Sequence, residues 1–145
     1  MYCDTDSVIF KSGPEDICYP SIDPYLGGLT DELGDENDYI TEFVSTGPKS
    51  YAYKTLKGKA CVKIKGITLT GVTGELFNVD TLTTLVDEYL EKGGKDCGVI
   101  NTECESIKRN KKTLTLQSVT LKRRFRVLYE KRLLHSDGTT SPYGY

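Results

Sequence analysis

The sequence predicts an α+β fold, with a sheet of antiparallel strands in the first part of the chain and a smaller mixed part after it. Runs of β-branched and aromatic residues, separated by Gly and Pro turns, recur before residue 68. One apolar stripe at helical spacing follows between residues 80 and 91. The chain has 145 residues, of which 37% are hydrophobic, enough for a modest core. We therefore expect two parts, residues 1–68 and 69–145.

The first predicted element is a β-hairpin over Tyr2–Phe10, with Asp4–Asp6 as its turn. Its second strand should pack three apolar residues into the sheet: Val8, Ile9 and Phe10. The acidic stretch at 15–38 is interrupted by several Pro and Gly residues, so we expect a loop there. One short helix should follow Asp23-Pro24, which can serve as cap and first helical residue.

Three further strands are predicted over Tyr39–Thr46, Tyr51–Thr55 and Ala60–Ile64. These segments are rich in β-branched and aromatic residues, and the turn pairs Gly47-Pro48 and Lys57-Gly58 separate them. Short turns between strands favour antiparallel pairing.

The clearest helix is predicted over Asp80–Glu91, with Asp80 as its cap and Gly93 closing its end. Its apolar residues recur at i, i+3, i+4, i+7 and i+8 and should face the core: Leu82, Leu85, Val86, Tyr89 and Leu90. After a turn at 93–98, the alternation predicts two strands, Thr113–Val119 and Arg124–Tyr129.

The net charge of −2 conceals a split along the chain. Residues 1–46 hold eleven Asp or Glu against one Lys, while residues 47–145 hold eighteen Lys or Arg against ten acids. This asymmetry suggests an acidic metal-binding part joined to a part that faces a polyanion. Five irregularly spaced cysteines and a single histidine argue against a zinc site or a disulfide framework. We expect a reduced intracellular protein, and the sequence has no apolar run long enough to predict a membrane span.

Chemistry is indicated most clearly at Asp4-Thr5-Asp6-Ser7, which apolar β-forming residues flank. Two carboxylates at a tight turn form a compact negative site that can hold divalent metal ions. The alternative is a solvated turn, since Asp and Thr also form hydrogen bonds with their own backbone.

The order of the motifs resembles the family B DNA polymerases. Tyr-Cys-Asp-Thr-Asp-Ser at 2–7 is similar to motif C, Lys49-Ser50-Tyr51 to the Lys-x-Tyr motif, and Lys63-Ile64-Lys65-Gly66 to the segment that follows it. Residues 122–127 and 142–145 resemble the C-terminal end of the protein-primed branch found in adenoviruses and in Polinton or Maverick transposons. The resemblance implies an antiparallel palm sheet with the catalytic hairpin over residues 1–68 and a small thumb-like subdomain over residues 69–145.

The resemblance also implies a DNA-directed DNA polymerase that uses two Mg²⁺ or Mn²⁺ ions, deoxynucleoside triphosphates and a DNA primer-template. Asp6 would be the direct metal ligand, Asp4 its neighbour in the site, and Thr5 and Ser7 would support the turn through their hydroxyls. Lys49 and Tyr51 would hold the primer terminus, because alternate residues of a strand share a face. The partners would include a priming protein, and the location would be the nucleus if the source is eukaryotic.

Basic residues follow these motifs and should bind phosphates without reading sequence. They are Lys63 and Lys65, which should share one strand face, and Lys122, Arg123, Arg124 and Arg126 in a basic segment near the C-terminus. The alternatives are a solvated sheet face, or contacts with other polymerase domains or with the priming protein.

The family places its exonuclease domain, another catalytic aspartate and its nucleotide-binding helix upstream of motif C. We therefore expect this chain to be a C-terminal fragment of a polymerase, inactive by itself. The alternative is a non-catalytic nucleic-acid-binding relic of a viral or transposon polymerase. A calcium-dependent structural domain is set aside because the acidic loop lacks the spacing of an EF-hand.

Overall fold

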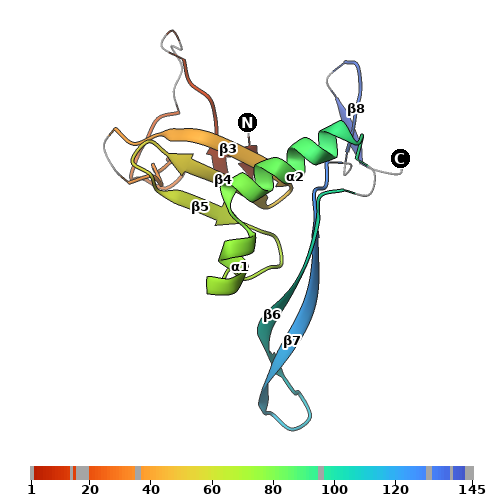
Figure 1. Ribbon diagram of the computed structural model, residues 1–145. Helices are drawn as coiled ribbons and strands as arrows, with labels where there is room; N and C mark the ends of the chain where they lie inside the picture. The colour runs from red at the N-terminus through yellow and green to blue at the C-terminus, as the bar shows by residue number, and fades with distance from the viewer. Residues whose placement is uncertain are drawn as a thin grey trace.

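The computed structural model describes residues 2–13, 15, 20–34, 37–94, 97–129, 132–137 and 139–142. These residues form an α+β structure with antiparallel sheets and few helices, as the sequence predicts (Figure 1). Two parts of the sequence interpretation, Cys18 and the final residues 143–145, lie outside the described residues.

The central sheet has three antiparallel strands in the order β3 (Ile40–Gly47), β4 (Ser50–Thr55) and β5 (Ala60–Lys63). The three strands predicted from turn residues and alternation are therefore confirmed. Val44 lies opposite Ala52, and Ala52 lies opposite Val62. Because side chains alternate along a strand, these small apolar residues give the sheet one face for a core.

Helix α2 (Val79–Glu91) packs against this face, and the short helix α1 (Gly71–Leu76) precedes it in the chain. Figure 1 shows α2 crossing the sheet, and α2 contacts β3 and β4. The prediction that Asp80 caps this helix was wrong: the Asn78 side chain caps it by accepting a hydrogen bond from the Thr81 backbone N–H at 2.8 Å. Asp80 lies in the first turn, where the helix dipole favours a carboxylate.

Helix α1 was not predicted, since six residues with glycines at both 71 and 74 show no helical periodicity. A capping box between Thr70 and Thr73 holds its first turn.

The hydrophobic core joins residues from both halves of the chain. Leu82 of α2 and Phe77 are fully buried, and the rings of Phe77 and Phe125 form a T-shaped pair at a centroid distance of 5.2 Å. Burying each of these side chains contributes about 1.5–3 kcal/mol. The other buried members are Val44, Ala52, Ile64, Ile67, Val79 and Cys104. Within the predicted helical stripe, Leu90 is 65% exposed because α2 extends beyond the sheet (Figure 1).

A long β-ribbon is formed by β6 (Val99–Arg109) and β7 (Leu116–Arg126), which pair in register from one end to the other. Figure 1 shows this ribbon extending away from the central sheet. The prediction of two short strands at 113–119 and 124–129 was wrong, because one continuous strand spans 116–126. Strand β6 was not predicted, since most of its side chains are polar. A small hairpin of β8 (Arg132–Leu134) and β9 (Thr140–Pro142) follows.

The predicted N-terminal hairpin is confirmed, with β1 (Tyr2–Asp4) paired to β2 (Ser7–Ile9). Thr5 begins the turn with a φ of 54°, as two-residue hairpin turns of the primed types require. The expected packing of Val8 and Phe10 was wrong, because they are 44% and 46% exposed. The reason is that β1 and β2 form a separate two-stranded sheet, and no third strand within the described residues covers their outer side chains.

The short helix expected after Asp23-Pro24 is replaced by a turn. The Asp23 carboxylate accepts a hydrogen bond from the Tyr25 backbone N–H at 2.9 Å, and the Gly28 N–H bonds the Tyr25 carbonyl at 2.9 Å. Asp23 therefore stabilises a turn that reverses the direction of the chain, instead of starting a helix.

Candidate functional site

The aspartate hairpin lies against the turn that joins β3 to β4. Lys49 in this turn places its Nζ 2.9 Å from Oδ2 of Asp4, although the two residues are 45 positions apart in the sequence. The backbone N–H of Lys49 donates a hydrogen bond to the Tyr2 hydroxyl at 3.0 Å. The two segments that resemble motif C and the Lys-x-Tyr motif therefore meet directly.

Aromatic rings hold the hairpin in this position. The Tyr2 ring lies 4.7 Å from Tyr51 and 6.3 Å from Phe43, measured between centroids. Tyr51 also stacks on Tyr53 at 6.4 Å. Because Phe43, Tyr51 and Tyr53 alternate with the core residues of their strands, they lie on the sheet face opposite α2. Sequence reasoning assigned no role to Tyr2, and its place beside the aspartate turn was the only signal.

Within the turn, the two hydroxyls take the positions expected of supporting groups. The Thr5 hydroxyl donates to Oδ1 of Asp4 at 3.2 Å, and the Ser7 hydroxyl donates to the Asp4 carbonyl at 3.1 Å. Asp6 occupies the exposed second position of the turn. The two carboxylates thus share one tight turn, with Asp4 directed toward Lys49 and Asp6 facing solvent.

Charge pairing fixes the protonation of this site. The hydrogen bond from Lys49 lowers the pKa of the Asp4 carboxyl, and the same contact raises the pKa of the Lys49 ammonium. Burial raises the pKa of the Tyr51 phenol. Burial and then a hydrogen bond with Cys61 raise the pKa of Tyr53 to about 12. At neutral pH the site therefore holds an ion pair beside neutral phenols that can donate hydrogen bonds.

A cavity of about 480 Å³ opens beside the ion pair. Its polar lining consists of Tyr2, Asp4, Lys49, Tyr51 and Lys63, and its apolar lining of Val62, Ile64, Ile67 and Leu69. The expectation that Lys49 and Tyr51 share a strand face was wrong, since Lys49 precedes β4 and has a φ of 59°. Both side chains nevertheless line the same cavity.

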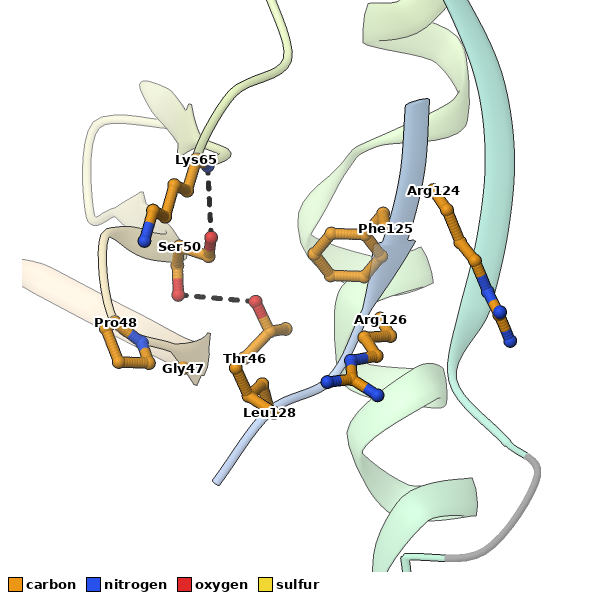
Figure 2. Close-up of a pocket in the computed structure, with 9 residues that line it drawn as sticks. All are labelled: Thr46, Gly47, Pro48, Ser50, Lys65, Arg124, Phe125, Arg126 and Leu128. Atoms are coloured by element: carbon orange, nitrogen blue, oxygen red, sulfur yellow. Dashed lines mark hydrogen bonds between the residues drawn. The ribbon is translucent and has the colours of Figure 1, made fainter. Parts of the chain in front are cut away.

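A second cavity, of about 210 Å³, separates the β3–β4 turn from the end of β7 (Figure 2). Lys65 lines it, and the Lys65 backbone N–H donates to the Ser50 hydroxyl at 3.1 Å. Figure 2 shows the Lys65 side chain running toward Pro48, on the opposite side of the cavity from Arg124. These cations therefore do not converge on one point.

The expectation that Lys63 and Lys65 share a strand face was wrong. Strand β5 ends at Lys63, and Lys65 lies in the turn that follows. The two side chains consequently line different cavities.

The basic residues of β7 are exposed and divide between its two faces. Lys122, Arg124 and Arg126 alternate along one face, and Arg123 lies on the face that carries Phe125. In the ribbon Lys122 lies directly opposite Glu103 of β6. The positive charge counted along the sequence is therefore partly balanced by the neighbouring strand, a partner that sequence reasoning missed.

The donor set at the hairpin suits part of a magnesium site. Mg²⁺ prefers oxygen ligands and is usually bound through one or two carboxylates, with waters and substrate phosphates as the remaining ligands. Asp4 and Asp6 supply two such carboxylates. Among the described residues, no group of three or more His, Cys, Asp or Glu side chains gathers to hold a metal by itself.

No helix in the described part of the chain is both long and apolar enough to span a membrane. No protein-family model, no curated protein and no solved structure matches the chain.

Proposed function

We propose that the chain is the palm and thumb part of a protein-primed family B DNA polymerase, with the palm portion at residues 1–68 and the thumb-like portion at residues 69–145. The observation that carries this proposal is the contact between the aspartate hairpin and the Lys-x-Tyr turn. Asp4 and Lys49 approach to 2.9 Å across 45 residues of sequence, and Tyr2 and Tyr51 pack beside them. A polymerase needs its metal-binding carboxylates next to the groups that hold the primer terminus.

In this proposal Asp6 and Asp4 hold Mg²⁺ or Mn²⁺ together with a carboxylate from an upstream segment. The ions supply charge neutralisation at the triphosphate and activation of the primer hydroxyl. Lys49 binds a phosphate near the primer terminus, and the neutral phenol of Tyr51 donates a hydrogen bond beside it. The apolar side of the cavity, including Val62 and Ile67, excludes water from the sugar.

The exposed cations of β7, with Lys63 and Lys65, contact the phosphates of the primer-template. Such contacts bind DNA without reading its sequence, as replication requires. Deoxynucleoside triphosphates and a priming protein are the other partners in this proposal. The protein acts inside the cell, in the nucleus if its source is eukaryotic.

One observation favours the second candidate, a non-catalytic nucleic-acid-binding relic. The Asp4 carboxylate, one of only two in the turn, is already neutralised by Lys49. A relic would keep this ion pair as a structural contact and would bind DNA without transferring nucleotides.

The test uses a polypeptide extended upstream to include the second aspartate motif and the nucleotide-binding helix. Templated primer extension and DNA binding are measured for Asp6→Asn and for Asp87→Asn, which removes the same charge from an exposed position of α2. We expect Asp6→Asn to abolish nearly all extension and keep DNA binding, while Asp87→Asn leaves both unchanged. An extended polypeptide that binds DNA but shows no extension in any form would favour the relic.

A further inference from the structure

We infer that the Asp4–Lys49 ion pair is a closed state of the DNA-binding site, in which Asp4 withholds the Lys49 ammonium from phosphate. The inference rests on the proposed DNA binding and adds a control on it. DNA binding by Lys49 then requires the ammonium to leave Asp4, and any group that neutralises Asp4 strengthens DNA binding.

The geometry separates a fixed main chain from a movable side chain. The Lys49 backbone is held by its hydrogen bond to the Tyr2 hydroxyl at 3.0 Å, and the Tyr2 ring is held by Tyr51. The side chains of Lys49 and Asp4 are 57% and 32% exposed, respectively. The Lys49 ammonium can therefore swing on its four-carbon chain without disturbing the docking of the hairpin.

The charges around the cavity make the pair a competitor of phosphate. Asp4 and the two cations Lys49 and Lys63 line the cavity, and Asp6 lies at the same turn as Asp4. While Lys49 is paired with Asp4, their charges offset one another, so a phosphate that enters meets the charges of Lys63 and Asp6. When Asp4 is neutralised, Lys49 becomes available and one repulsive charge disappears.

The size of the effect follows from the exposure of the pair. Only molecules with a released Lys49 bind with full strength, so the apparent dissociation constant rises by the reciprocal of their fraction. Exposed ion pairs are weak, which limits the closed state to an effect of about two- to fivefold. Mg²⁺ bound at Asp4 should release Lys49 and so strengthen DNA binding. This effect is opposite to the ordinary effect of Mg²⁺, which weakens DNA binding as a counterion.

The experiment measures binding of a labelled primer-template to the 145-residue chain by fluorescence anisotropy, with metals chelated. We expect Asp4→Asn, which keeps an acceptor for the Thr5 hydroxyl, to bind about two- to fivefold more tightly than the unchanged chain. Asp6→Asn is the matched control, because it removes the same charge from the same turn but keeps both members of the ion pair. In a Lys49→Met background, Asp4→Asn should bind no more tightly than Asp6→Asn.

A second arm adds Mg²⁺ at constant ionic strength and follows the Asp4 carboxyl carbon by NMR. We expect the effect of Mg²⁺ on DNA binding to be more favourable for the unchanged chain than for Asp4→Asn. We also expect DNA alone to move the Asp4 signal in the unchanged chain, because its Lys49 donor leaves. The NMR measurement with DNA needs no variant, so it tests the inference even if Asp4→Asn does not fold.

Equal gains for Asp4→Asn and Asp6→Asn would overturn the inference, as would an Asp4→Asn gain that persists with Lys49→Met or an Asp4 signal unmoved by DNA. Salt-dependent DNA binding would survive each of these outcomes, so the proposed function would stand. A chain that binds no DNA in any form would contradict the proposed function itself, and the inference with it.

Discussion

Gly47 offers a sharp test of how the β3–β4 turn is held against the second half of the chain. Its φ is +130°, and a Cβ added there would lie 2.5 Å from the Leu128 carbonyl oxygen. That oxygen belongs to the backbone and cannot rotate away as a side chain could. Gly47→Ala must therefore strain the turn, displace Leu128, or do both.

The loss can be worked out from two contributions. A non-glycine residue forced into such a backbone conformation costs about 1–3 kcal/mol. Displacing Leu128 weakens the hydrogen bond from its backbone N–H to the Thr46 carbonyl, which measures 2.9 Å, and a bond of this kind contributes about 1 kcal/mol. Gly47→Ala should thus lower the free energy of unfolding by about 2–4 kcal/mol. With a denaturant slope of roughly 2 kcal/mol per molar urea, the midpoint should fall by about 1–2 M.

Equilibrium urea unfolding followed by circular dichroism measures this change. Gly58→Ala is the matched control, because Gly58 also has a positive φ, of +81°, but its added Cβ would meet no atom of the described part of the chain within 4 Å. It should lose only the backbone contribution, about 1–2 kcal/mol. If Gly47→Ala lost no more stability than Gly58→Ala, the close approach of Leu128 to the turn would not be a feature of the folded protein.

Four further predictions can be checked on simpler readouts. The 145-residue chain should bind DNA weakly and without sequence preference, with an affinity that falls steeply between two salt concentrations in a filter-binding assay; tight binding that ignores salt would contradict this. The same chain should incorporate no nucleotide, so templated extension by pure protein would refute the need for upstream carboxylates. Because Lys49 lowers the pKa of Asp4 below its ordinary 3.8, the stabilisation from this pair should persist above that value and vanish as the pH falls through the folded pKa, and Lys49→Met should return the NMR titration of Asp4 toward 3.8. Tyr53 should ionise at about 12 in an ultraviolet titration of the folded chain, with its share of stability present below its ordinary 10 and lost as the pH rises through 12.

Elements with a local cause could be predicted from the sequence. The hairpin at Tyr2–Phe10 and the three central strands depend on alternation and on turn residues a few positions away, and both signals are visible in any short window. The approach of Asp4 to Lys49 has no such local signal, because 45 residues separate them. Only the resemblance to the polymerase motifs brought these two residues into one site before the structure was known.

Elements decided by tertiary contacts could not be predicted. Strand β6 carries few apolar residues and is held by the register of β7. Lys49 lines its cavity from a left-handed backbone conformation, which the residue type does not predict. The charge of Glu103 balances that of Lys122 only because the ribbon places them opposite each other. The sequence alone does not indicate this pairing.

The β6–β7 ribbon has a consequence for how the protein opens. Near its base Phe125 and Cys104 are buried on one face. Toward the loop that face exposes Lys108 and Gln117, and the opposite face exposes Ile107 and Leu116. A two-stranded ribbon without a packed face is marginal in water. Amide hydrogens in its outer half should therefore exchange through local opening, at a free energy well below that of global unfolding. Those of β3 and β4 should exchange only through global unfolding. The outer half can consequently bend to follow a curved surface without loosening the core around Leu82.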